Sequence, residues 1–482
     1  MTKNLRTVAS LGLGLCLGHT LAAEEPRTGV GPEPNPVPLT REDMKKALED
    51  SKRSVPRLPL PPLSEDEKAK AAEAGKDPAA RSRGLGAGIV NNGRMRSHYL
   101  ADYADGSRGG LFGLGGFGGG SSANRAGGAG AGRDPGLSLD NAFQTMMFWI
   151  VSRGNNCTYC MGHQESKLAA TGLTDDQIAA LDGDWSEFDE PKRAAFAFAR
   201  KLTFEPHAMG NADIDALRKH YDDARITEII LAVAGFNSIN RWTGPLRIPQ
   251  EERHVYLKPT SEEFASRLTR VAPVKEVSAT SGCVLPTAHR RPELESRPEV
   301  EAALEVVRWR SPRLKLADES ATKGVLNGTL GEAAPAAWMR LLATLPDSAA
   351  SRVAATLAAE QKGTLDPKTK AIIAWVAARN DRAWYALGHA RKRLRSLGLD
   401  DDQIFALDRP DTLESPADRE VVKYAAKITV NPALADDGDI DRLRKLFDDK
   451  KVAEVVFQVT QAAYFDRMTE AAGLRLEDSA LE

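Results

Sequence analysis

Residues 155–168 read NNCTYCMGHQESKL, and this stretch holds two cysteines and a histidine at helical spacing. Cys157, Cys160 and His163 follow one another at intervals of three residues. On an α-helix such residues are neighbours, so two sulfur atoms and an imidazole would lie within reach of disulfide formation and proton exchange. The stretch therefore predicts a redox site on a helix.

The sequence on both sides of this stretch also indicates helices. Residues 139–153 are largely apolar and contain neither Gly nor Pro, as expected of a buried helix. Gly172 suits a helix C-cap, and Thr174 and Gln177 have the spacing of a capping box that starts the next helix. Further helices are expected at 191–202, 212–221 and 226–242. No alternating strand pattern is found here, so we predict an all-α fold.

The last third of the chain repeats this layout. His389 follows His163 at an offset of 226 residues (389 − 163 = 226). A constant offset predicts a duplication in which both copies share one fold. Applied to the two cysteines, it gives Ala383 and Ala386, so the second copy cannot perform thiol chemistry. The same offset also pairs Trp149 with Trp375, Pro206 with Pro432, Asp213 with Asp439, and Arg241 with Arg467.

A helix, Cys-x-Tyr-Cys, a nearby histidine, Ala-x-x-Gly-Leu and Asp-Asp-Gln-Ile follow one another in this order. In this combination the segment resembles the carboxymuconolactone decarboxylase and alkylhydroperoxidase D-like superfamily, and residues 236–242 look like its closing helix. The resemblance covers about residues 137–249, and a degenerate version covers about 336–476. It implies an all-α fold with two tandem domains of this type, and a chain that can form a homo-oligomer.

The resemblance also implies roles for the candidate residues. Cys160 would attack a peroxide, and Cys157 would resolve the resulting sulfenic acid, with a glutamate and a histidine as proton relay. In this chain the family's histidine position holds Gln164, while His163 stands one residue earlier. The neighbourhood of the family's glutamate holds Gln144, which cannot accept a proton at neutral pH. Glu165 is a candidate substitute for that glutamate.

Other uses of the cysteine pair stay open at this point. A structural disulfide is one, although so short a loop removes little entropy from the unfolded chain. Structural zinc needs four ligands, and no second Cys-x-x-Cys is present. Covalent haem is excluded because Met161 stands where Cys-x-x-Cys-His needs histidine. We therefore expect no metal and no cofactor, and we interpret Cys283 as a bystander.

Composition divides the chain of 482 residues into five parts. Residues 1–23 have the charged start, apolar run and small residues of a cleaved signal peptide. Residues 24–136 are rich in proline and then glycine, and are expected to be largely disordered apart from a short helix near 41–52. Residues 137–250 form the domain with the cysteine pair, 251–300 a linker, and 301–482 the degenerate domain.

The net charge of −2 provides no basic surface for nucleic acid. No stretch suits a membrane span in the mature protein. We therefore predict an exported thiol oxidoreductase, periplasmic or extracellular, with a peroxide or disulfide substrate and a thiol electron donor. The alternative is a non-catalytic helical scaffold with a structural disulfide. Decarboxylation of a lactone is a third hypothesis, and no residue pattern favours it.

Overall fold

The computed structural model of the protein describes residues 37–63 without 39, residues 65, 68 and 69, and residues 90–103, 139–252, 254, 256, 293–326 and 333–481. Within these ranges every regular element is a helix, so the predicted all-α fold is confirmed. The α-helices are α1 (Arg41–Asp50), α4 (Asn91–Tyr99), α5 (Asn141–Gly154), α6 (Thr158–Ala170), α7 (Asp175–Ala179), α8 (Glu190–Phe204), α9 (Asn211–Arg218), α10 (Asp223–Thr243), α12 (Arg297–Trp309), α13 (Glu319–Leu326), α14 (Ala337–Leu342), α15 (Pro346–Gln361), α16 (Pro367–Asp381), α17 (Trp384–Ser396), α18 (Asp401–Ala406), α19 (Pro416–Val430), α20 (Asp437–Arg444) and α21 (Asp449–Ala472).

Capping side chains set the starts of several of these helices. The Asp140 carboxylate accepts a backbone N–H in the first turn of α5, and Asp366 does the same for α16. Thr174 and Gln177 form the predicted capping box at the start of α7, and Asp400 begins an equivalent box at α18. Each cap satisfies a backbone donor that the helix itself leaves unpaired, so these residues place the helix boundaries locally.

The helices from α5 to α10 recur 226 residues later. Helix α6 begins at Thr158 and α17 at Trp384 (384 − 158 = 226), while α10 begins at Asp223 and α21 at Asp449 (449 − 223 = 226). Helices α5, α7, α8 and α9 correspond in the same way to α16, α18, α19 and α20. We name α5–α10 the first repeat and α16–α21 the second repeat. The constant offset found in the sequence is thus an offset between matching helices.

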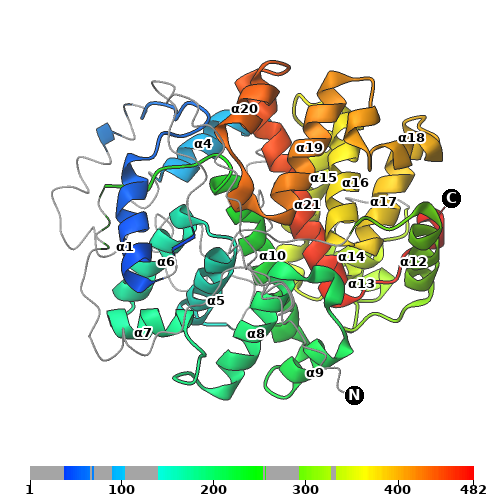
Figure 1. Ribbon diagram of the computed structural model, residues 1–482. Coiled ribbons are helices and arrows are strands. Elements are labelled where there is room, and N and C mark those ends of the chain that lie inside the picture. Colours follow the sequence, from blue (N-terminus) through cyan, green and yellow to red (C-terminus); the bar gives the residue numbers. More distant parts are fainter. Residues whose placement is uncertain are drawn as a thin grey trace, which may run out of the picture.

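The long helices α10 and α21 pack against each other at the centre of the molecule, with the first repeat on one side and the second on the other (Figure 1). Arg241 of α10 donates from Nη2 to the carbonyl of Thr429 at 2.8 Å. Arg467 of α21 donates to the carbonyl of Thr203 at 3.1 Å. Since both pairs differ by the same offset, each repeat contacts the other through equivalent residues. Two subunits related by a two-fold axis make contacts of this reciprocal kind.

Two helices of the proline- and glycine-rich region 24–136 pack on the repeats. Helix α1 lies on α6, and it corresponds to the short helix expected near 41–52. Helix α4, which the sequence did not indicate, contacts α21, and its Asn92 bonds both Tyr159 and Trp242 in the first repeat. Helix α12 lies on α17 much as α1 lies on α6. The first repeat therefore has a helical cover contributed by residues far upstream of it.

Several predicted features fall outside the described residues. These are the signal peptide at 1–23, most of the glycine-rich stretch, and Cys283 in the predicted linker. Among the helices that the structure describes, none is long and apolar enough to cross a membrane.

Candidate functional site

A tight turn between α5 and α6 presents the cysteine pair. Asn156 adopts a positive φ of 48°, a conformation that asparagine tolerates better than most residues. The side chain of the preceding Asn155 donates to the amide oxygens of Asn237 at 3.0 Å and Asn240 at 2.9 Å. Both of these acceptors lie on α10, so the turn is fixed to the central helix. Cys157 follows as the N-cap of α6.

Both thiols are free and buried, and they share one polar neighbour. Cys157 and Cys160 are 1% and 3% exposed. Each sulfur atom lies 3.1 Å from the hydroxyl oxygen of Thr243, at the end of α10. That hydroxyl also donates to the carbonyl of Ile239 at 3.0 Å. The sequence reasoning did not identify Thr243 or Asn240 as parts of the thiol site, because both lie more than 80 residues downstream of the cysteines.

The surroundings favour one negative charge on the pair. Burial opposes ionisation of Cys157, but hydrogen bonds from Cys160, Thr243 and Asn240 outweigh burial and lower the pKa of Cys157. Burial raises the pKa of Cys160, and so do its hydrogen bond to Cys157 and the charge that Cys157 acquires. The first proton is therefore lost from Cys157, which lies at the helix N-terminus where a thiolate is stabilised.

His163 points toward a carboxylate and away from the sulfur niche. Its Nε2 lies 2.7 Å from Oε2 of Glu251, and its ring packs on Tyr159 at 4.5 Å between centroids. Tyr159 donates to Oε1 of Glu251 at 3.0 Å. Burial opposes ionisation of Glu251, but its contacts with His163 and with the Asn91 N–H lower its pKa to about 2. The structure thus brings Cys157 and Cys160 together and places His163 in a separate cluster one helical turn away.

The same cluster is present in the second repeat, which lacks the cysteines. His389 and Glu477 lie 2.9 Å apart, and Tyr385 donates to Glu477 at 2.9 Å. All three residues follow their counterparts by 226 positions, for example 477 − 251 = 226. Sequence reasoning missed Glu251 because it fell in the predicted linker. Extending the repeat offset by ten residues would have found it.

The two substitutes considered for the relay glutamate have other partners. Gln144 donates to the carbonyl of Leu139 at 3.0 Å and to the buried carboxylate of Glu228 at 2.9 Å. Glu165 accepts two hydrogen bonds from Arg41 and one from the indole of Trp149. Both side chains therefore hold helices together.

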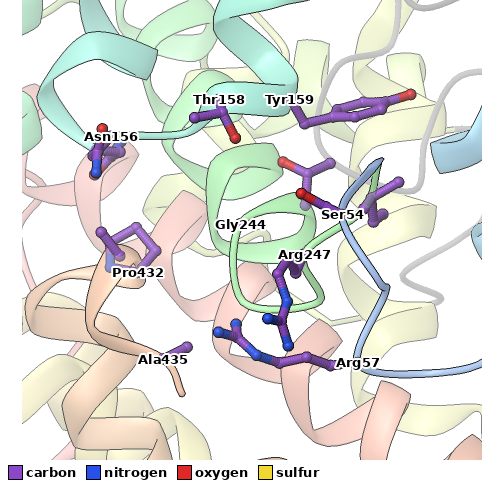
Figure 2. A pocket seen from close by; sticks show the side chains of 13 residues that line it. Ser54, Arg57, Asn156, Thr158, Tyr159, Gly244, Arg247, Pro432 and Ala435 are labelled. Atoms are coloured by element: carbon purple, nitrogen blue, oxygen red, sulfur yellow. The ribbon is translucent and has the colours of Figure 1, made fainter. Parts of the chain in front are cut away.

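A pocket of about 480 Å³, partly open to solvent, lies beside the cysteine turn. Thr243 lines it, and so does Thr158 at the start of α6 (Figure 2). The N-terminal segment contributes Arg57, the end of the first repeat Arg247, and the second repeat Pro432. Both arginines bind the carboxylate of Asp437 from the second repeat. The wall of the pocket thus comes from three parts of the chain, and it carries two guanidinium groups against one carboxylate.

Fold and site together define an all-helical protein with a buried, reduced Cys-x-x-Cys pair at the start of a helix. No family profile matches the chain. It is 25% identical over 108 residues to the uncharacterized protein YdfG of Bacillus subtilis (strain 168), which is 22% of this chain and 73% of that protein. The debrominase Bmp8 is 15% identical, covering 39% of this chain and 92% of its own, with a TM-score of 0.28. A variant of Bmp8 in complex with 2,3,4-tribromopyrrole gives a TM-score of 0.29. Similarities this low do not define a family, so function is argued from the site.

Proposed function

We propose that this protein is an exported thiol oxidoreductase similar to the alkylhydroperoxidase D-like class, which reduces a peroxide or a disulfide through Cys157 and Cys160. The observation that carries the proposal is the pair itself, reduced, buried and held at equal distance from Thr243. A hydroxyl that can turn toward a sulfur stabilises a thiolate without adding a fixed charge. A thiolate beside a second thiol is the arrangement that two-electron thiol chemistry needs.

With a peroxide, the thiolate attacks one oxygen atom and the O–O bond breaks. The leaving alkoxide takes a proton to become an alcohol, and the attacking sulfur becomes a sulfenic acid. The second thiol then attacks that sulfur and releases water as the disulfide forms. With a disulfide substrate, the thiolate forms a mixed disulfide and the second thiol displaces it. Either route oxidises the pair by two electrons, so an external thiol donor must reduce it again.

The two cysteines receive different roles from the resemblance and from the local contacts. The resemblance implies that Cys160 attacks and Cys157 resolves. The hydrogen bonds around the pair favour Cys157 as the residue that ionises first. Because the thiolate is the nucleophile, we propose that Cys157 carries the reactive charge in the resting dithiol.

The second repeat has a part in this proposal although it has no thiols. We infer a duplicated chain in which the second copy acts as an internal partner. Pro432, Ala433 and Ala435 of the second repeat complete the pocket beside Thr243. The excess positive charge of Arg57 and Arg247 over Asp437 favours an anionic substrate at this pocket.

Single-turnover reduction tests the proposal directly. The reduced protein is mixed with hydrogen peroxide or with glutathione disulfide, and loss of the two thiols is followed together with consumption of the substrate. We expect two thiols lost per substrate consumed, and no turnover in Cys160→Ser or Cys157→Ser. His389→Ala, in the repeat without cysteines, serves as the matched control and should keep full activity. Full turnover in Cys160→Ser would refute the proposal.

A further inference from the structure

Three side chains that can ligate a metal converge beside α6. His163 projects from α6, while Glu251 and His254 come from the segment that follows α10. Each offers one ligand atom, and the three atoms lie within 4.8 Å of one another. The imidazole rings of His163 and His254 stand 5.0 Å apart and nearly perpendicular, at 84°. Two imidazoles and a carboxylate are a donor set that zinc-type ions bind.

The groups around the cluster orient its carboxylate. Oε1 of Glu251 accepts the Tyr159 hydroxyl at 3.0 Å and the Asn91 N–H at 2.8 Å. Both donors use the same oxygen, so Oε2 is the atom directed at His163. A metal site typically fixes its ligands through hydrogen bonds to the atoms that do not bind the ion.

The tautomer of His254 follows from its neighbours in the same way. The Tyr256 hydroxyl donates to Oε1 of Gln250 at 3.0 Å, so its one proton is committed there. Nδ1 of His254 lies 2.7 Å from that hydroxyl and must be the donor. The neutral imidazole therefore carries its proton on Nδ1 and its lone pair on Nε2, as a ligand requires.

The contact between His163 and Glu251 also differs from its counterpart. Nε2 and Oε2 lie 2.7 Å apart, yet they are not aligned as a hydrogen bond, and neither buried atom has a hydrogen-bond partner among the described residues. In the second repeat, His389 and Glu477 do form a hydrogen bond, at 2.9 Å. A cation between the first pair would satisfy both atoms at once.

The sequence differs between the repeats at the residues that would complete such a site. The offset of 226 places Ala480 opposite His254 (480 − 254 = 226) and Leu476 opposite Gln250 (476 − 250 = 226). The second repeat thus keeps the histidine and the glutamate but lacks the third ligand and the residue that helps orient it. Only the first repeat has the complete set.

We propose that His163, Glu251 and His254 bind a divalent transition-metal ion of the zinc type, with a fourth position open to water. Ligand atoms around a tetrahedral ion are about 3.3 Å apart, and rotation of the half-buried His254 imidazole brings the three to that spacing. The ion joins the segment after α10 to the helix that bears the cysteines. This assignment is independent of the thiol chemistry, because it uses neither sulfur.

Metal titration of the full chain without an affinity tag tests the assignment. The background is Cys157→Ala with Cys160→Ala, so that the thiol pair cannot bind the ion. Cobalt(II) is the probe, followed by its visible ligand-field bands, and zinc(II) is used as competitor. We expect one equivalent of cobalt bound with tetrahedral-type bands. His254→Ala and Glu251→Gln should each weaken binding at least ten-fold. His389→Ala, which alters the two-ligand counterpart, should leave affinity unchanged.

X-ray absorption at the zinc edge of the wild-type protein gives a measurement that needs no variant to fold. The expected first shell contains only nitrogen and oxygen at about 2.0 to 2.2 Å. A sulfur shell at about 2.3 Å would overturn the assignment in favour of the cysteines. Absence of stoichiometric binding would overturn it as well, and so would affinity that survives in both His254→Ala and Glu251→Gln.

Discussion

The guanidinium of Arg41 grips the carboxylate of Glu165 with two hydrogen bonds, at 2.5 and 2.7 Å. The side chains of both residues are almost fully buried, 3% and 7% exposed. Arg41 begins α1 and Glu165 lies on the cysteine helix α6, so this ion pair ties the proline-rich N-terminal region to the candidate site. The carboxylate also accepts the indole N–H of Trp149, at 2.8 Å.

Breaking this pair from one side should be costly. Arg41→Ala leaves a buried carboxylate without its counter-charge, and such changes cost about 3–5 kcal/mol. We expect that loss in the free energy of unfolding, measured by urea denaturation. Arg53→Ala is the control, because Arg53 pairs with Asp50 at the surface and should change stability by less than about 0.5 kcal/mol. Equal effects of the two substitutions would contradict the structural role assigned to Arg41.

Thr243→Val should raise the pKa of Cys157. Valine matches the shape of threonine but removes the hydroxyl that lies 3.1 Å from both sulfur atoms. A hydrogen bond to a charged group contributes about 1.5–3 kcal/mol, equivalent to about one to two pKa units. The reduced variant should therefore react more slowly with iodoacetamide at neutral pH, and its rate profile should shift to higher pH.

Thr469→Val provides the matched control for that measurement. Thr469 occupies the equivalent place on α21, where its hydroxyl bonds backbone carbonyls and the alanines replace the cysteines. Its substitution should leave the alkylation profile unchanged. If both threonine variants shift the profile equally, the effect reflects general loosening of the core and not the thiol contact.

The two single cysteine variants should differ in reactivity. Cys160→Ser keeps the thiol whose pKa is lowered, whereas Cys157→Ser keeps the thiol whose pKa is raised by burial. We expect faster alkylation of Cys160→Ser at neutral pH, although neither variant turns over. The reverse order of alkylation rates would return the nucleophile to Cys160, as the family resemblance implies.

Gly162→Ala should disturb the segment that carries Glu251 and His254. A Cβ at this position would overlap the side chains of Gln250 and Tyr256, which pack directly on α6. We expect weaker cobalt binding in the metal titration described above. Gly388→Ala is the control, since its Cβ would meet Leu476 in the second repeat and leave the three ligands untouched. Unchanged cobalt affinity in Gly162→Ala would separate the segment's packing from the proposed site.

Much of the fold could be predicted from local signals. Capping at Thr174 and Gln177 is a short-range pattern, and the repeat offset needs only residue identities along the chain. These signals place helices, and the structure confirms them. They also predict which helices correspond, because an offset held without gaps leaves no freedom in the alignment of the repeats.

The parts that escaped prediction depend on contacts between distant residues. Arg41 and Glu165 are separated by 124 positions, and no periodic pattern links them. Spacing alone placed His163 beside Cys160, but the ring is drawn toward Tyr159 and Glu251, which a one-dimensional pattern does not reveal. Helix α4 was missed because it contains a glycine and no apolar stripe, and its packing comes from tertiary contacts.

The redox midpoint potential of the Cys157 and Cys160 pair tests the central claim most directly. The purified protein is equilibrated in thiol buffers of graded potential, and the fraction of free thiol is measured after acid quenching and alkylation. A catalytic pair should titrate between about −120 and −270 mV, the range of thiol oxidoreductases. A pair that stays oxidised to below about −300 mV would be a structural disulfide. That result would contradict the proposed function and favour a helical scaffold.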